Sequence, residues 1–161
     1  MPQDNIRTSK ISVANALLIP EILAIIGEGH TVTLPLRGYS MRPFLEDRRD
    51  KALLSAAETV AVGDVVLAEI APKRYALHRI VGLDGDSVTL LGDGNLVCEH
   101  CQRSDIKAKA LGFYRKGRTV LDSTSAPKWR IYSAVWTRLY PIRRYLLFVY
   151  RHLFVRNGGG K

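Results

Sequence analysis

The sequence predicts a mainly β fold, α+β overall, with a helical N-terminus and a pair of helices at the C-terminus. Three observations predict it. Between residues 31 and 122, short runs of aliphatic and β-branched residues follow one another, separated by Gly, Pro and Asp. Residues 11–28 and the segment after Pro127 instead carry apolar side chains at helical spacing. The chain of 161 residues is long enough for one domain with a substantial core.

The predicted N-terminal segment covers residues 1–30. Its apolar part, ISVANALLIPEILAIIGE at 11–28, contains Pro20 and ends near Gly27, so one kinked helix or two short helices are expected. The apolar run is too short, and too interrupted by Pro20 and Glu21, to span a membrane. The first residues lack the apolar core and cleavage site of a secretory signal, so we expect a cytoplasmic protein.

The middle segment, residues 31–125, is expected to form six to eight strands. Asp84-Gly85 lies between two β-branched runs, which is a strong signal for a hairpin. The runs interpreted as strands are, in chain order, TVTLPL, KALLSA, DVVLAEIA, RYALHRIV, SVTLLG, IKAKALGFYRKG and RTVLD.

The last segment, residues 126–161, combines helical spacing of Trp129, Tyr132 and Trp136 with positive charge, and Pro141 separates its two expected helices. It holds eight Lys and Arg and no Asp or Glu, in a chain of net charge +9. The rest of the chain is nearly neutral, which argues against a nucleic-acid partner. The basic, aromatic residues of 128–156 suit the surface of an anionic membrane, and packing of one helical face on the β core or on a partner explains them equally well.

A turn after the first strand run holds a candidate nucleophile. The stretch LRGYSMRP places Ser40 between Tyr39 and Met41, with Gly38 two residues before it. A serine hydroxyl is a poor nucleophile unless a neighbouring base takes its proton. His78, in RYALHRIV, shares a strand face with small and apolar neighbours, which suits a partly desolvated base near a cleft and also an ordinary core histidine.

Two acidic residues are candidates to orient the imidazole. Asp93 lies in the turn Gly-Asp-Gly-Asn that follows the next strand run, and Glu99 comes six residues later. A carboxylate that accepts a hydrogen bond from the ring fixes its tautomer, as in a catalytic triad. The tetrapeptide is equally explained as a turn with no further role, so the residues leave the choice between the two acids open.

In this order, Gly-x-Ser-Met-x-Pro, Gly-Asp-Val-Val, His-Arg-Ile-Val and Gly-Asp-x-Asn resemble the signal peptidase and repressor self-cleavage superfamily of serine peptidases. The resemblance runs from about Thr31 to Gly112 and covers neither terminal segment. It is closest to the archaeal and endoplasmic-reticulum type, whose base is a histidine rather than a lysine. It implies a signal-peptidase-like β core with Ser40 as nucleophile, His78 as general base, and the family's acids at Asp93 and Glu99.

The sequence departs from this family at two places. Many signal peptidases have a hydroxyl residue where this chain has Gly38, so the oxyanion would be bound by backbone N–H groups, with that of Ser40 the first candidate. We also expect no counterpart of the N-terminal transmembrane anchor of signal peptidases, because the apolar run at 12–26 is too short to span. Gly38, Tyr39 and Met41 are the expected substrate-binding residues, with Met41 lining a shallow pocket for a small side chain.

The expected function is that of a serine endopeptidase that cleaves a peptide, leader or signal-like segment. Two alternatives remain: a non-catalytic peptide-binding or assembly module on the same fold, and a membrane-surface adaptor that acts through the basic tail. The expected partners are a peptide or protein substrate and an anionic membrane surface, but not nucleic acid. No cofactor or metal site is predicted, because Cys98 and Cys101 lack the further ligands that a structural zinc requires. Peripheral attachment at the inner membrane surface is the alternative to a purely cytoplasmic location.

Overall fold

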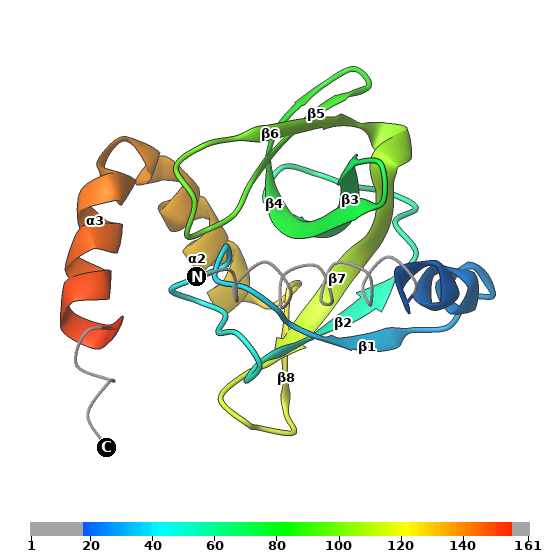
Figure 1. Cartoon of the computed structure of the whole chain (residues 1–161), viewed down its shortest axis with the longest axis horizontal. Coiled ribbons are helices and arrows are strands. Elements are labelled where there is room, and N and C mark those ends of the chain that lie inside the picture. The colour runs from blue at the N-terminus through cyan, green and yellow to red at the C-terminus, as the bar shows by residue number, and fades with distance from the viewer. Residues whose placement is uncertain (1–17, 156–161) are drawn as a thin grey trace, which may run out of the picture.

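One antiparallel sheet of eight strands organises the fold, which confirms the predicted mainly β, α+β class. The computed structural model describes residues 18–155 (Figure 1). Along the sheet the order is β1-β2-β7-β3-β4-β5-β6, and β8 pairs with β7. The strands are β1 (Val32–Pro35), β2 (Lys51–Ser55), β3 (Val65–Ala71), β4 (Arg74–Asp84), β5 (Ser87–Leu91), β6 (Glu99–Gln102), β7 (Ile106–Tyr114) and β8 (Leu121–Ser123).

Helices flank the sheet at both ends of the described chain, as the sequence predicted. Residues 18–27 are helical, and residues 11–17 of the expected N-terminal helix lie outside the described part. No helix within residues 18–155 is long and apolar enough to cross a membrane. The remaining helical elements are the 3-10 turn η1 (Arg103–Asp105), α2 (Pro127–Arg138), the 3-10 turn η2 (Tyr140–Ile142), α3 (Arg143–Tyr150) and the π-helical turn η3 (Arg151–Val155).

The predicted hairpin joins β4 to β5. Asp84 pairs with Ser87, and Gly85 has a φ of +55°, in the left-handed region that such a two-residue turn requires. The sequence did not predict β6, whose residues Glu99–Gln102 alternate between half-buried and exposed. A polar strand at the edge of a sheet carries little hydrophobic signal, and β6 lies at such an edge, where β5 is the strand it pairs with.

The strand β3 has a different part of the core on each face. Val65 and Leu67 pack in the larger apolar cluster, and Val66 and Ala68 pack in a smaller one with β4 and β5, as alternation along a strand requires. The larger cluster also joins the N-terminal helix, β1, β2 and β7 to the first turn of α2 through Trp129. In Figure 1, β3 to β6 form a strongly curved part of the sheet, above the strands β1, β2 and β7.

Helix α2 is fixed to the sheet through its aromatic side chains. The ring centroid of Trp129 lies 4.6 Å from that of Phe44 and 4.9 Å from that of Phe113 on β7. Trp129, Ser133 and Trp136 are buried along one side of the helix, and Ile131 and Val135 are exposed on the other. Packing on the β core, one of the two alternatives for the tail, therefore describes this first helix.

Candidate active site

Ser40 lies between β1 and β2, in residues 36–50, which we name the Ser40 turn. Near the start of this turn, Gly38 has a left-handed backbone conformation. Gly38 has a φ of +85°, which non-glycine residues rarely adopt, and its N–H donates to Asp47 Oδ1 at 2.8 Å. Any residue with a side chain at this position would be strained. The Gly38 N–H already donates to Asp47, so it is not a free donor for an oxyanion.

Replacing Gly38 by serine should destabilise the protein. The left-handed conformation costs a non-glycine residue about 1 kcal/mol or more, so we expect the free energy of unfolding to fall by about that amount in chemical denaturation. Gly27→Ala is the control, because Gly27 ends a helix and its added methyl meets no atom within 4 Å. This control should be neutral or stabilising. Equal losses in the two variants would contradict the conformational explanation.

The two other residues expected to bind substrate have opposite environments. Met41 is only 5% exposed and packs in the larger core cluster. Tyr39 is exposed, with the Arg42 guanidinium 4.0 Å from its ring centroid. Ser40, between them, is half-buried. Of Tyr39, Ser40 and Met41, only Tyr39 therefore has an exposed side chain, and it lies next to the candidate nucleophile in sequence.

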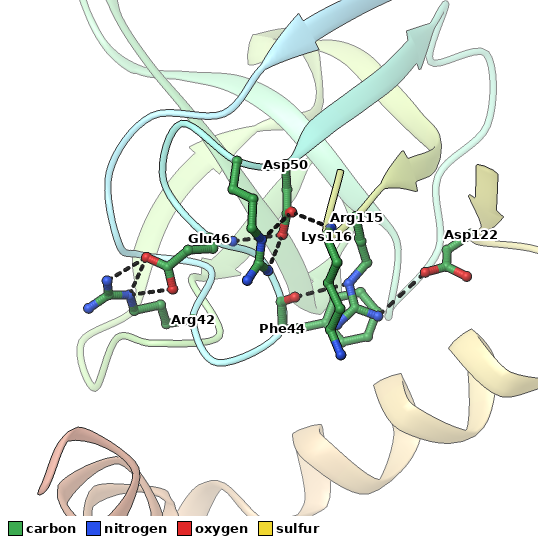
Figure 2. Close-up of polar contacts among 8 residues, drawn as sticks. Arg42, Phe44, Glu46, Asp50, Arg115, Lys116 and Asp122 are labelled. Carbon is green, nitrogen blue, oxygen red and sulfur yellow. Dashed lines mark hydrogen bonds and ion pairs between the residues drawn. The ribbon is translucent and has the colours of Figure 1, made fainter. Parts of the chain in front are cut away.

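A polar network ties the Ser40 turn to the hairpin between β7 and β8 (Figure 2). The carboxylate of Asp50 is fully buried and accepts hydrogen bonds from the backbone N–H groups of Glu46 and Lys116, both at 2.9 Å, and from the Arg49 side chain at 2.8 Å. Burial alone would raise the pKa of Asp50, but the bonds from Arg49 and from the backbone outweigh it and lower the pKa. The ionised carboxylate therefore fixes the end of this turn.

The same turn makes two further polar contacts shown in Figure 2. Arg115 Nε donates to the Phe44 carbonyl oxygen at 3.1 Å, and its guanidinium lies 3.4 Å from the centroid of the Phe44 ring. Arg42 and Glu46 form an ion pair one helical turn apart in sequence. From the sequence, neither Asp50 nor Arg115 was assigned a role, because each is bonded to a residue that is distant in sequence.

The Gly-Asp-Gly-Asn turn packs directly against the Ser40 turn. The Gly94 N–H donates to the Ser40 carbonyl oxygen at 2.7 Å. A Cβ atom on Gly92 would lie 2.5 Å from that same oxygen, and one on Gly94 would lie 2.8 Å from the Tyr39 carbonyl oxygen. Both glycines are thus required by the close approach of the two backbones, and two motifs distant in sequence become neighbours.

Asp93, in the middle of this turn, is paired with Arg79. Both side chains are fully buried, and Arg79 Nε and Nη2 donate to the two carboxylate oxygens at 2.8 and 2.7 Å. Burial by itself would lower the pKa of Arg79, but its bonds to Asp93 raise the pKa overall. The pair is therefore charged.

Helix α2 completes the surroundings of this ion pair. The Tyr132 hydroxyl donates to Asp93 Oδ2 at 3.1 Å, and Trp136 Nε1 donates to the Asp93 carbonyl oxygen at 3.1 Å. Ser133 also contacts the Arg79 guanidinium. Sequence reasoning assigned no role to Arg79 or to these helix residues at the site, although the Trp129 to Trp136 spacing indicated a helix with a buried aromatic face.

Glu99 is the acid that the structure places beside His78. The distance from His78 Nδ1 to Glu99 Oε2 is 2.6 Å, and the His78 side chain is only 6% exposed. The two atoms are close, but their angles do not meet those of a hydrogen bond, and neither atom has another hydrogen-bond partner within residues 18–155. Burial lowers the pKa of His78, and the nearby Glu99 carboxylate opposes this only in part. The imidazole is therefore neutral at pH 7.

The register of the sheet explains how Glu99 reaches His78. Strand β5 separates β4 from β6, but it ends at Leu91, opposite Arg79. His78, one residue earlier on β4, thus lies just beyond the end of β5. Glu99 opens β6 and pairs with Leu90, so its side chain can approach the imidazole past that end.

A small cavity of about 150 Å³ separates the Ser40 turn from β4. Gly38, Ser40 and Met41 line one side, and Tyr75 and Leu77 line the other with the residue between them. His78 follows these β4 residues directly but does not itself line the cavity. A larger cavity of about 940 Å³, between α2 and β7, contains none of the predicted catalytic residues, so its size does not make it the candidate site.

Comparison of the sequence with protein-family models and with curated proteins finds no match. The case for a function therefore depends on the side chains and their geometry.

Proposed function

We propose that this protein is a serine endopeptidase that cleaves a peptide, leader or signal-like segment, with Ser40 as nucleophile and His78 as general base. One observation carries the proposal: a buried histidine with a lowered pKa contacts a carboxylate and sits at the end of the strand segment that faces Ser40. A neutral imidazole, one nitrogen of which faces an acid, is the form that a general base needs.

The proposed reaction assigns a different role to each nitrogen of the His78 ring. A proton on Nδ1, facing Glu99, leaves the lone pair on Nε2 to take the proton of the Ser40 hydroxyl as Oγ bonds to the peptide carbonyl carbon. The C–N bond then breaks, and His78 returns the proton to the leaving amine. A water molecule, deprotonated by His78, hydrolyses the resulting ester and restores Ser40. The Ser40 N–H is the first candidate donor to the oxyanion, since Gly38 N–H is bonded to Asp47.

In this proposal Glu99 is a positioning residue, and Asp93 has a structural role. Glu99 orients the imidazole and stabilises the imidazolium that forms during acylation. Asp93 neutralises Arg79 and holds the turn against which Ser40 packs. The cavity beside Ser40 is small, so we expect a small side chain at the cleavage site.

The pH dependence of cleavage tests the role of His78. The imidazole must be neutral to act as a base, and its pKa is lowered. We therefore expect kcat/KM to stay constant through about pH 6.5, where histidines usually titrate, and to fall only at lower pH. In Glu99→Gln the acidic limb should move to still lower pH, since the carboxylate that favours the imidazolium is gone. The measurement is kcat/KM against pH with a fluorogenic peptide identified from a library. An acidic limb that stays in place in Glu99→Gln would remove Glu99 from this role.

A second candidate function is that of a non-catalytic peptide-binding module. It is favoured by the position of His78, which does not line the cavity at Ser40. The two functions separate on incubation of the intact chain with a peptide library and mass spectrometry of the products. Cleavage that Ser40→Ala abolishes supports the peptidase, and retention of peptides without cleavage supports the binding module.

A further inference from the structure

Helix α3 and the following turn η3 present an apolar surface that the described protein does not cover. Tyr145, Phe148 and Phe154 are 60%, 70% and 68% exposed, and Val149 and Leu153 are each about half exposed. Large apolar side chains gathered on one short segment are unusual on a protein surface and mark an interaction site. We name these five residues the α3 surface.

The opposite side of the same helix fixes its orientation on the protein. Arg143 and Leu147 are buried, and Arg143 Nη2 donates to the Trp136 carbonyl oxygen at 2.9 Å. The Arg143 guanidinium also lies 5.1 Å from the centroid of the Trp136 ring. Because the helix is held to α2 by its inner side, the α3 surface points away from the protein, and Figure 1 shows α3 standing apart from the sheet.

The charge around the α3 surface favours one kind of partner. Arg144 and Arg151 are exposed, and the chain from residue 126 onward contains no Asp or Glu to neutralise them. The Arg144 guanidinium lies 4.8 Å from the centroid of the Tyr145 ring, so cation and aromatic side chain share one edge of the surface. Aromatic and aliphatic side chains with arginines beside them match the boundary between acyl chains and anionic headgroups. A second copy of the chain would bring like charges together, and nucleic acid would leave the aliphatic side chains without partners.

We propose that the α3 surface docks the protein on an anionic phospholipid bilayer, with Phe148 and Phe154 entering the interface and Arg144 and Arg151 contacting headgroups. This inference is independent of the proposed peptidase activity.

Vesicle flotation with the intact chain tests the proposal. Binding is measured to vesicles of phosphatidylcholine alone and of equal parts phosphatidylcholine and phosphatidylglycerol, at rising salt. We expect binding to the anionic vesicles only, and weaker binding as salt screens the arginines. Arg144→Gln with Arg151→Gln should weaken binding about 25-fold, at roughly fivefold for each cation. Phe148→Ser should weaken it at least about tenfold.

Matched variants elsewhere on the surface serve as controls. Lys73→Gln with Arg118→Gln removes two exposed cations from other loops, and Val120→Ser removes an apolar side chain that is 72% exposed. Neither control should change binding by more than about twofold. Equal losses in the controls, equal binding to uncharged vesicles, or no binding to any vesicle would each overturn the proposal. So would self-association through Phe148 without vesicle binding, which would assign the surface to a second copy.

Discussion

Replacing Ser40 by alanine should abolish cleavage and leave the fold intact. The change removes one hydroxyl from a half-buried turn residue, so the free energy of unfolding should stay within about 1 kcal/mol of that of the unmodified protein. The kcat/KM for a cleaved peptide should nevertheless fall by several orders of magnitude, because the nucleophile has no substitute. Peptide hydrolysis followed by mass spectrometry, with thermal denaturation of the same samples, measures both effects.

The partner of Ser40 is tested in the same assay. His78→Ala should cost about as much activity as Ser40→Ala, and the double variant should cost little more than either one, since nucleophile and base act as a unit. Ser87→Ala and His100→Ala are the matched controls, because both residues are exposed and lie on neighbouring strands. They should leave kcat/KM unchanged. A Ser40→Ala protein that cleaves at the original rate would exclude Ser40 as the nucleophile and favour the peptide-binding module.

Replacing Asp93 by asparagine should destabilise the protein by about 3–5 kcal/mol. The substitution leaves the fully buried Arg79 guanidinium without its carboxylate, and an uncompensated buried charge carries a cost of that size. Denaturation by urea measures the loss. Glu99→Gln should change stability by much less, because Glu99 is partly exposed, and should instead lower turnover by orders of magnitude.

A second substitution distinguishes the charge effect from a general loss of packing. Arg79→Met added to Asp93→Asn should recover part of the lost stability, because no buried charge then remains unpaired. An Asp93→Asn protein that keeps its stability and loses turnover would contradict this assignment. That outcome would make Asp93, and not Glu99, the acid that acts on His78.

The strands and helices were largely predictable because their signals are local. The Asp84-Gly85 turn between β-branched runs sets the β4–β5 hairpin, and the aromatic spacing from Trp129 to Trp136 sets α2. Strand β6 was missed for the opposite reason. Its residues Glu99–Gln102 are polar and lie at the sheet edge, so their conformation depends on the backbone of β5 rather than on their own preference.

From the sequence alone, every strand except β6 and both terminal helical regions could be predicted, together with the few residues proposed as nucleophile, base and acid. Only the tertiary structure decided which acid meets which base. Asp93 and Glu99 are close in sequence, but β5 ends at Leu91, and this leaves His78 open to Glu99 from β6. Arg79, which is buried next to His78 on β4, needs a carboxylate to pair with and forms its ion pair with Asp93. Pairing of a buried charge is a property of the packed interior, where desolvation makes an unpaired charge costly, and no local pattern encodes it.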